Sequence, residues 1–398
     1  MGKLVTGRVL SGRVRPGDLL KALDEKGAVV EENVKVTRVL MSRGLAQEPV
    51  DDGAGSGDVV SIAGFSRATV NSTLCAPAVS DPIPSDPIDP PVLSLAFQVN
   101  TGPMAGRDGK RVTAALLEER LGKEAETNVA LRIQKQGDGD FLVSGRGELQ
   151  LGILLENMRR EGFELLVSPP SVVLREDEHG DPIEPVEEVV IEVESRHANA
   201  VSDMLSKRGG ELQETLDQGG DITRLHFEIP SRGLIGFRSV FMRLTRGQGN
   251  MNHNLVRYDP VLPETRAPER GALVSNAMGK ATSYALAALE PRGQLFVQPN
   301  TEVYPGMVVG ENNRAEEMLV NPTKTKHLTN VRASGNDENI RLAPPRLFTL
   351  EEALAYVAAD EYVEVTPNHI RFRKQELDEN KRARATKDAK NARKSGKK

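Results

Sequence analysis

The chain has 398 residues, of which 38% are hydrophobic and 27% charged, so it is long enough for three or four globular domains. Aromatic residues make up 4% and Trp is absent, which argues against base stacking on an aromatic platform as the main mode of nucleic-acid binding. The single Cys75 excludes an internal disulfide, and the lack of any run of 18 apolar residues excludes a membrane-spanning helix.

The net charge of −5 is unevenly distributed along the chain. Residues 371–398 contain 12 Lys or Arg and 4 Asp or Glu, a local charge of +8 that leaves −13 on the other residues. A basic tail on an acidic body indicates contact with a polyanion, because the tail can displace counterions from phosphates. A disordered, solubilising tail is an equally good interpretation of this composition.

Residues 1–80 predict a β-barrel, because short β-runs are separated by turns such as Pro16-Gly17-Asp18 and no long helical period interrupts them. Prolines then crowd residues 81–91. Such a segment can hold neither a helix nor a central strand, so we expect a semi-rigid linker there.

Residues 92–178 predict a ferredoxin-like βαββαβ domain. Apolar and polar residues alternate from Leu93 to Val99, as in a half-buried strand. The clearest helix has an apolar stripe at positions i, i+3, i+4 and i+7, formed by Leu151, Leu154, Leu155 and Met158. Gly162 follows this helix where a left-handed C-terminal cap would fall.

Residues 184–264 repeat the same pattern and predict a second ferredoxin-like domain. Arg146 and Arg232 are 86 positions apart, and Gly162 and Gly249 are 87 positions apart. This nearly constant offset indicates an internal duplication of a whole small domain.

Residues 265–374 predict a mixed C-terminal domain with a less regular pattern. A helix is expected after Thr349, which forms a capping box with Glu352, and a hairpin is expected over 362–372. Residues 375–398 predict a basic, disordered tail. The expected fold class is therefore multidomain α+β, with a β-barrel, two ferredoxin-like domains and a mixed C-terminal domain.

The sequence shows no assembled catalytic or metal-binding motif. The segment nearest to a phosphate loop, Gly279 to Thr282, has Val274 where the first glycine is needed and Ala281 where a magnesium ligand is needed. The six histidines are scattered, and Cys75 has no electropositive neighbour in the sequence. We therefore expect no catalytic residue, cofactor or metal in this chain, and no nucleotide hydrolysis by the chain alone.

Cations are interspersed with Asn and Thr residues between Asn312 and Arg341. Cations and hydrogen-bond donors without large apolar side chains are typical of a loop that follows phosphates. The alternative is an ordinary polar loop. We favour a phosphate-binding role because the tail provides a second basic segment.

Four specific strings stand out: SGRGELQLGILLENMRREGFELLVSPP, PSRGLIGFRS, LTNVRASG and TLEEALAYVAADEYVEVTP. Together they resemble the BipA/TypA family of translational GTPases of bacteria and plastids, which is similar to elongation factor G, and the resemblance extends from Leu4 to the tail. The family pattern implies a GTPase domain that holds GTP and Mg²⁺, followed by a β-barrel, two βαββαβ domains and a family-specific C-terminal domain. Because this chain starts inside the barrel, the resemblance implies that the GTPase domain is missing and that the chain alone is not an enzyme.

The resemblance also implies ribosome binding, with contacts to large-subunit rRNA and A-site tRNA. The protein is expected to be a soluble monomer of the cytoplasm or plastid stroma. It would act in translation, stress response or large-subunit assembly. The implied RNA-contacting residues would neutralise phosphates and donate hydrogen bonds. They are Arg232, Arg238, Lys280, Arg314, Lys324, Lys326, His327 and Arg332. One alternative is an interaction module that docks and regulates a separate GTPase domain, and a less favoured one is an unrecognised hydrolase.

Overall fold

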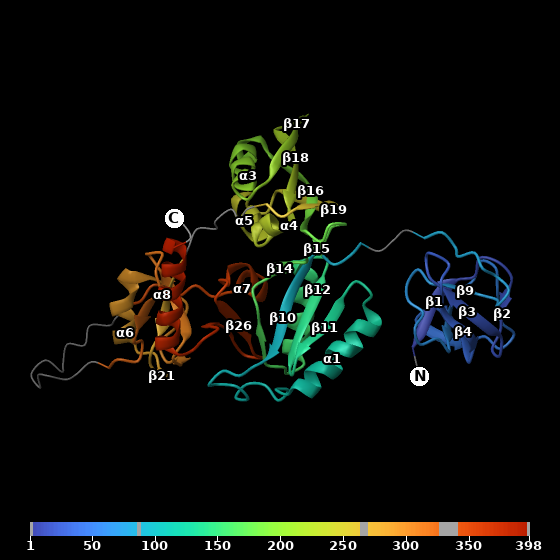
Figure 1. The fold of residues 1–398 in the computed structure, drawn as a ribbon, viewed down its shortest axis with the longest axis horizontal. Helices are drawn as coiled ribbons and strands as arrows, with labels where there is room; N and C mark the ends of the chain where they lie inside the picture. The colour runs from blue at the N-terminus through green and yellow to red at the C-terminus, as the bar shows by residue number, and fades with distance from the viewer. Residues whose placement is uncertain (1–2, 86–88, 263–269, 326–340, 396–398) are drawn as a thin grey trace, which may run out of the picture. The chain divides into compact units, whose positions relative to one another are not determined.

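The computed structural model describes residues 3–85, 89–262, 270–325 and 341–395 (Figure 1). It divides into two compact units, Met1–Asp89 and Pro90–Lys398. The boundary falls inside the Pro-rich segment 81–91, where proline restricts the backbone and removes hydrogen-bond donors. Both units are rich in strands and the second also contains helices, so the multidomain α+β class is confirmed at this level.

Every element of residues 3–85 is a β-strand, in agreement with the short β-runs of the sequence. The strands are β1 (Leu4–Arg8), β2 (Arg13–Val14), β3 (Leu19–Leu23), β4 (Val29–Lys35), β5 (Arg38–Arg43), β6 (Ala46–Pro49), β7 (Ala54–Gly55), β8 (Val59–Ala63) and β9 (Thr73–Cys75). They form three antiparallel sheets with the orders β1-β8-β5-β6, β4-β3-β9 and β2-β7. Their apolar side chains meet in one core around Val39, Val60, Ile62 and Phe65.

The second unit opens with a βαββαβ order. Its elements are β10 (Leu93–Val99), α1 (Ala114–Thr127), β11 (Arg132–Gly137), β12 (Asp140–Gly145), α2 (Glu148–Arg160) and β13 (Leu165–Val167). The apolar stripe expected from the sequence is buried on α2 and packs with the inward residues of β10. Gly162 has a φ of +91°, the left-handed conformation that a C-terminal cap requires.

The second copy of this order is built around a five-stranded sheet. Its elements are β15 (Arg175–Glu176), β16 (Pro182–Glu194), α3 (Ser195–Lys207), β17 (Glu211–Gly219), β18 (Ile222–Pro230), α4 (Ser231–Leu234), α5 (Phe237–Leu244) and β19 (Asn250–Pro260). The glycine in the left-handed conformation after α5 is Gly247 rather than Gly249, which packs against Phe241. The two copies therefore correspond less regularly than the offset of 87 suggests.

The C-terminal region continues the first sheet of the second unit. Its elements are β20 (Gly271–Ser275), β21 (Gly279–Lys280), α6 (Ser283–Leu289), the 3₁₀ helix η1 (Glu290–Arg292), β22 (Gly293–Leu295), β23 (Glu302–Val303), β24 (Met307–Asn312), β25 (Met318–Val320), α7 (Leu350–Tyr356), β26 (Glu361–Val365) and β27 (Ile370–Lys374). The expected capping box of Thr349 and Glu352 is present at α7. The helix, the hairpin and their caps thus match the local sequence signals.

Strand β26 pairs with β13, with Leu165 opposite Val365, and so joins two regions that the sequence separates at residue 265. The resulting 11-stranded sheet follows the order β11-β12-β10-β13-β26-β27-β24-β20-β25, while β14 (Ser171–Val172) pairs with β10 and β22 pairs with β24. Buried residues of both regions form one core that includes Phe97, Leu155, Leu354 and Phe372. Local patterns cannot reveal such a pairing, because it joins strands that lie far apart in the sequence.

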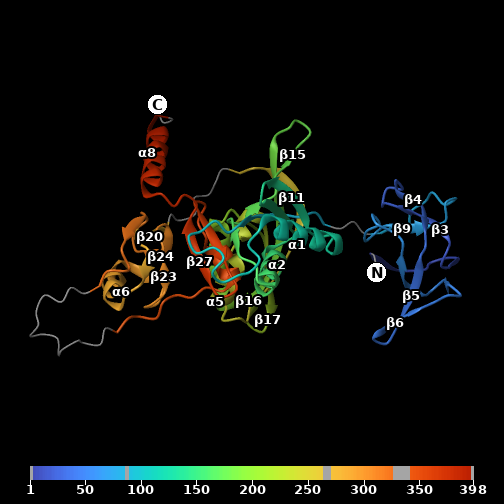
Figure 2. The same cartoon turned by 90° about the horizontal axis from the view of Figure 1, so that it is seen from below.

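The basic tail differs from its prediction, because residues 379–395 form helix α8 (Glu379–Ser395) instead of a disordered segment. The helix projects from the region of β20, β24 and α6 (Figure 2). Ala, Lys, Arg and Glu make up most of its sequence, and these residues have the highest helix propensities. The composition of this segment fits both a disordered tail and a helix. In the structure the helix is also anchored by an ion pair between Arg382 and Glu317.

The two βαββαβ copies touch at equivalent positions. The backbone N–H of Gly236, between α4 and α5, donates a 2.7 Å hydrogen bond to Oε1 of Glu148, the first residue of α2. Gly236 has a φ of +69°, and a Cβ there would lie 2.9 Å from the Cβ of Ala355 on α7. Burial raises the pKa of Glu148, although the hydrogen bond from Gly236 and the charge of Arg208 oppose the effect.

Replacing Glu148 by Gln is expected to stabilise the protein at pH 8 by up to about 1 kcal/mol, because Gln keeps the acceptor for Gly236 and removes a buried charge. A raised pKa in the folded state means that the stabilising contribution of Glu148 is complete below its unfolded pKa and is lost as the pH rises through its folded pKa. The gain from Glu148→Gln should therefore shrink towards pH 5. Urea unfolding across this range, with Glu148→Ala as the variant that loses the acceptor, measures it, and a constant gain would contradict the assignment.

Candidate nucleic-acid interface

The candidate cations of the C-terminal region are placed by strands β20 and β25, which run parallel. Leu273 pairs with Met318 and Ser275 with Val320, so the two strands end at the same edge. Arg314 lies in the loop before β25 and Lys324 follows its end, which puts these two cations at opposite ends of the strand. Gly271, at the start of β20, is required because any Cβ would collide with the carbonyl oxygen of Arg314.

Lys280 and Lys324 are brought together by the cap of α6. The hydroxyl of Thr282 accepts a 3.1 Å hydrogen bond from the backbone N–H of Ala285 and donates to the carbonyl oxygen of Lys324. The N–H of Thr282 also donates to the carbonyl of Pro322 at 3.0 Å. Both lysine side chains are exposed, and neither forms an ion pair with another described residue.

Two exposed side chains that were not predicted as contacts flank Lys280 along the chain. Met278 is 57% exposed and Tyr284, in the first turn of α6, is 46% exposed. A tyrosine ring next to cations can stack on an unpaired base while the cations bind phosphates. The low aromatic content of the chain gives no sequence signal for this residue, although one exposed ring is sufficient for such a contact. We call Met278, Lys280, Tyr284 and Lys324 the α6 surface.

Arg314 is exposed and lies in the loop to which α8 is attached. Nε and one terminal nitrogen of Arg382, in the first turn of α8, lie 3.1 and 3.0 Å from Oε1 of Glu317. Arg382 also donates to the carbonyl oxygens of Glu376 and Leu377. These bonds hold the start of a helix whose sequence contains Lys381, Arg382, Arg384, Lys387, Lys390, Arg393 and Lys394.

The two arginines of the second copy have different environments. Nε of Arg232 lies 3.1 Å from Oε2 of Glu184, which is 1% exposed, and a terminal nitrogen donates to the carbonyl of Leu262 at 2.8 Å. Removing Arg232 would leave a buried carboxylate unpaired, so its contacts are structural. Arg238 is exposed on α5 and forms no ion pair with a described residue. Three further predicted contacts, Lys326, His327 and Arg332, lie outside the described residues.

The phosphate-loop-like segment from Gly279 to Thr282 has another role in the structure. Gly279 and Lys280 form strand β21, Ala281 is buried, and the side chain of Thr282 is used as the cap of α6. These residues do not fit a nucleotide phosphate site. Among the described residues, no group of three His, Cys, Asp or Glu side chains could hold a metal ion.

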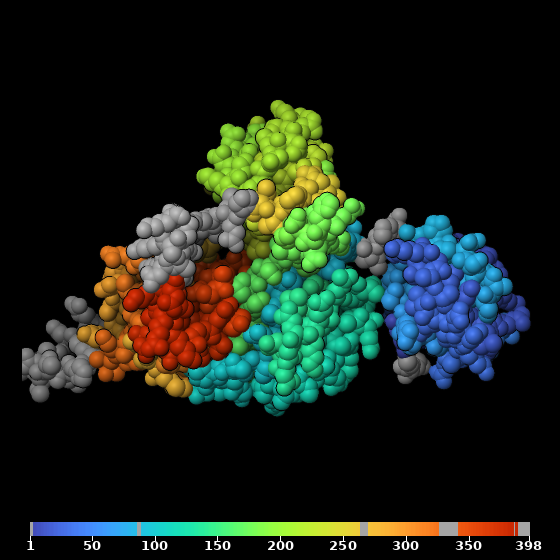
Figure 3. Space-filling view, viewed as in Figure 1, coloured from blue at the N-terminus to red at the C-terminus, as the bar shows by residue number. Residues whose placement is uncertain are grey.

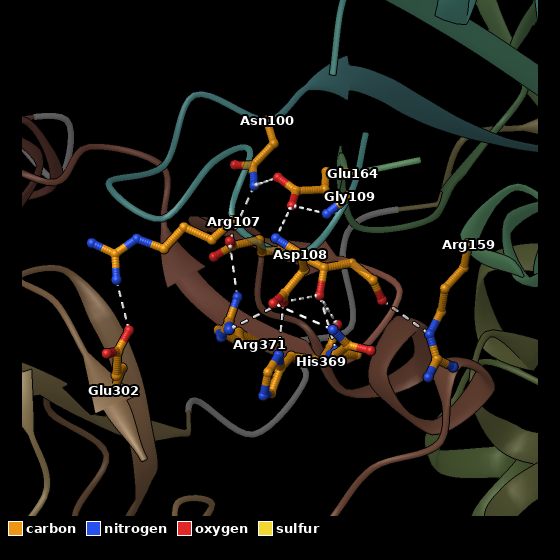
Figure 4. Close-up of polar contacts among 12 residues, drawn as sticks. Asn100, Arg107, Asp108, Gly109, Arg159, Glu164, Glu302, His369 and Arg371 are labelled. Atoms are coloured by element: carbon orange, nitrogen blue, oxygen red, sulfur yellow. Dashed lines mark hydrogen bonds and ion pairs between the residues drawn. The ribbon is translucent and has the colours of Figure 1, made fainter. Parts of the chain in front are cut away.

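Asp108 is the centre of a polar cluster that ties the loop before α1 to the β26–β27 turn (Figure 4). His369 Nδ1 lies 2.7 Å from its carboxylate, the hydroxyl of Thr366 donates at 2.8 Å, and Arg371 lies at 3.6 Å. Burial acts to raise the pKa of Asp108, but the hydrogen bonds from His369 and Thr366 outweigh it and lower the pKa. Thr366 donates to the acid rather than to the imidazole, so His369 activates no hydroxyl and the cluster is structural.

Two buried carboxylates extend this cluster. Glu364 is 0% exposed and accepts hydrogen bonds from Tyr304 Oη at 2.5 Å, Asn100 Nδ2 at 3.1 Å and Arg371 at 3.2 Å. Glu164 accepts backbone N–H groups of the loop before α1, from Gly106, Asp108 and Gly109. Burial and the negative charge of Glu364 raise the pKa of Tyr304, which therefore stays a donor. The C-terminal region is thus bonded firmly to the first βαββαβ copy.

The helices of the described residues include none that is long and apolar enough to cross a membrane. Cys75 is partly buried, and burial raises the pKa of its thiol, which makes the reactive thiolate less accessible. Neither feature adds to the interface.

Three protein-family models match the chain. They are the TypA/BipA C-terminal domain over residues 270–379, the elongation factor G C-terminus over 182–267 and elongation factor Tu domain 2 over 2–75. Similar curated proteins are named "Large ribosomal subunit assembly factor BipA". The protein of Bacillus subtilis is 42% identical over 98% of this chain and 64% of its own length, that of Salmonella typhimurium 43% over 98% and 64%, and that of Synechocystis 42% over 94% and 62%. The chain therefore spans slightly less than two thirds of the length of these relatives.

These relatives correct one expectation. The sequence alone predicts that the chain is not an enzyme and lacks a GTPase domain, but 98% of the chain aligns with proteins named as BipA assembly factors, and this match contradicts that prediction. The absence of a phosphate-loop motif from these 398 residues is therefore not evidence that the protein is not an enzyme. Neither the non-enzyme assignment nor the missing domain is maintained.

Replacing Asp108 by Asn is expected to lower the free energy of unfolding by about 1–3 kcal/mol at pH 7, because the charge-assisted bonds from His369 and Thr366 weaken. A lowered pKa in the folded state gives stability that is present above the unfolded pKa and is lost as the pH falls through the folded pKa, so the difference between wild type and variant should begin to shrink at about pH 4 and vanish below the folded pKa. Urea unfolding at each pH measures the difference. Asp138→Asn, in an exposed hairpin turn, is the matched control, and a gap that persists in acid would refute the account.

Proposed function

This chain belongs to the BipA/TypA family of translational GTPases, and from that premise we propose that it contacts ribosomal RNA and tRNA through basic surfaces of its C-terminal region. The curated relatives are named as assembly factors of the large ribosomal subunit, which supports the large subunit as the partner. The proposed RNA targets are large-subunit rRNA and A-site tRNA. The physiological setting would be translation, stress response or subunit assembly in the cytoplasm or plastid stroma, with the protein as a monomer.

The α6 surface is the strongest support for an RNA contact. Lys280 and Lys324 are held on adjoining segments by the bonds of Thr282, and both project from the fold without an acidic partner among the described residues. Two unpaired cations at fixed positions can release counterions from neighbouring phosphates without first breaking an internal ion pair. Tyr284 adds a ring that can stack on a base regardless of its sequence.

The second support is the region around Arg314 and α8. Arg382 forms an ion pair with Glu317, which fixes the start of the helix, and Lys381 forms an ion pair with Glu376. Arg314 lies three residues before Glu317 in the same loop. The proposed role of this region is electrostatic attachment to a phosphate backbone, which carries affinity but little sequence specificity.

The proposed roles of the different parts of the chain follow the predicted domains. Residues 1–80 would form the β-barrel, 92–178 and 184–264 the two ferredoxin-like domains, and 265–374 the RNA-contacting region. We propose GTP and Mg²⁺ as the cofactors of the whole protein, as in its family. The segment that most resembles a phosphate loop does not fit them, so no chemical step is assigned to residues of this structure.

Changing both Lys280 and Lys324 to Gln is expected to weaken binding to purified large ribosomal subunits about tenfold at 100 mM KCl. It should also reduce the slope of log affinity against log salt by about 1.4–1.8, because each of the two lost phosphate contacts removes about 0.7–0.9. Filter binding of the full chain between 50 and 300 mM KCl measures both quantities. The control changes Lys123 and Lys207, exposed lysines of α1 and α3, to Gln with the same loss of charge. An unchanged slope in the Lys280 and Lys324 variant would refute the α6 surface as an RNA contact.

A further inference from the structure

A groove of about 460 Å³ lies on the sheet face of the first βαββαβ copy that α1 and α2 leave uncovered. Side chains alternate along β10, so Leu93, Leu95 and Phe97 face the core with the helices while Ser94 faces the groove. The segment around β14 and β15 forms the other wall, and its surface adjoins that of the region including β11 in Figure 3. The volume falls in the range of small-ligand sites, about 300–1,000 Å³.

The lining of the groove is cationic and contains no carboxylate. Its polar members are Arg132, Arg175, Gln134, Ser94 and Ser144. Its apolar members are Pro91, Leu142, Val172, Val173 and Leu174. Guanidinium and amide donors suit a phosphate, and an apolar wall suits the sugar or base attached to it, whereas the hydroxyl of Ser94 is already bonded to Ser171.

The two arginines of the groove have no acidic partner among the described residues. Arg120 pairs with Glu124 and Glu161, whereas neither Arg132 nor Arg175 forms an ion pair with a described residue. An arginine without an internal ion pair is available to a ligand without the loss of an existing charge pair.

Arg175 is also held in position. It lies on β15, opposite Ile183 of β16, and its guanidinium carbon is 4.3 Å from the centre of the Tyr258 ring. Stacking on an aromatic face restricts the guanidinium plane and leaves its edge, which carries the N–H donors, free to meet an anion. Arg132 comes from the opposite wall, on the edge strand β11.

We propose that this groove binds a nucleotide, with Arg132 and Arg175 on its phosphate and the wall of Pro91, Leu142 and Val173 against its sugar or base. The nucleotide is either a free monophosphate or one unit of a single-stranded RNA, which share this chemistry. The site is separate from the α6 surface, because β11 is at one edge of the 11-stranded sheet and β25 is at the other. It does not depend on how the C-terminal region meets the ribosome.

The test measures binding of cytidine monophosphate by calorimetry and of a labelled eight-residue oligouridine by fluorescence anisotropy, both at 25 mM salt with the full chain. Hydrogen exchange then reports whether β11 and residues 172–175 become protected. Arg132→Gln and Arg175→Gln should each weaken binding about tenfold, as expected for loss of a charge-assisted phosphate bond. Arg160→Gln removes the same charge from an exposed position of α2, on the helical side of the sheet, and should leave binding at the groove unchanged.

Comparing the monophosphate with the oligouridine distinguishes a site for a free nucleotide from a site for an RNA strand. Competition between the monophosphate and the oligouridine, with protection of the groove by both, would identify a nucleotide pocket, and protection by the oligouridine alone would identify an RNA-strand site. Absence of protection by both, or equal affinity of the two groove variants and the Arg160→Gln control, would overturn the proposal. Arg132 is exposed and forms no ion pair with a described residue, so its variant is expected to fold and keeps the test decisive even where Arg175→Gln unfolds. Large-subunit binding through Lys280 and Lys324 is a separate measurement, so failure of one inference does not imply failure of the other.

Discussion

The antiparallel pairing of β13 with β26 is the contact on which the second unit depends. It joins strands 200 positions apart, Leu165 to Val365, and makes one sheet from two regions that would otherwise have exposed edges. One core under this sheet takes residues from both regions, so this part of the apolar surface is buried only when the two regions pair, while a second core is formed almost entirely by the C-terminal region. The positions of the described cations Lys280, Arg314 and Lys324 therefore depend on a strand pairing in the middle of the sheet.

Buried charges reinforce this junction. Glu364 and Arg371 lie on the paired strands β26 and β27, and their mutual contact is completed by Asn100 and Tyr304. A buried ion pair gains little net free energy unless its remaining donors and acceptors are satisfied. Here the additional partners of the Glu364 carboxylate come from different segments, so its oxygens are fully bonded only when the loop before α1 and the C-terminal hairpin are both in place, while Nε of Arg371 is buried without a hydrogen-bond partner. Such a network favours one arrangement of the chain over alternatives that would be equally hydrophobic.

Local features were predictable from the sequence because their causes are local. The apolar stripe of α2, the left-handed Gly162 and the capping box of Thr349 all follow from residues within a few positions of one another. The pairing of β13 with β26 depends on contacts across the chain, and no periodicity records them. The same limit applies to Arg232: its sequence position suggests an exposed contact, yet its partner Glu184 lies 48 positions away and is buried. The groove is a further case, since its two arginines are distant in sequence and meet only through the fold.

The formal charge of the chain is a poor guide to where it can bind a polyanion. Many of its arginines and lysines form ion pairs within the fold, such as Arg120 with Glu161 and Lys374 with Glu361. The charge of such a cation is largely neutralised by its partner, so it attracts a ligand only weakly. Charges separated by more than about 8–10 Å are largely screened at physiological salt, so only a cation near a phosphate contributes. Lys280, Lys324, Arg132 and Arg175 are therefore more informative than the total of −5, because each is exposed and none is paired with a described acid. The net negative charge of the rest of the chain repels polyanions. It therefore disfavours unspecific contacts and confines binding to the few places where cations have no acidic partner.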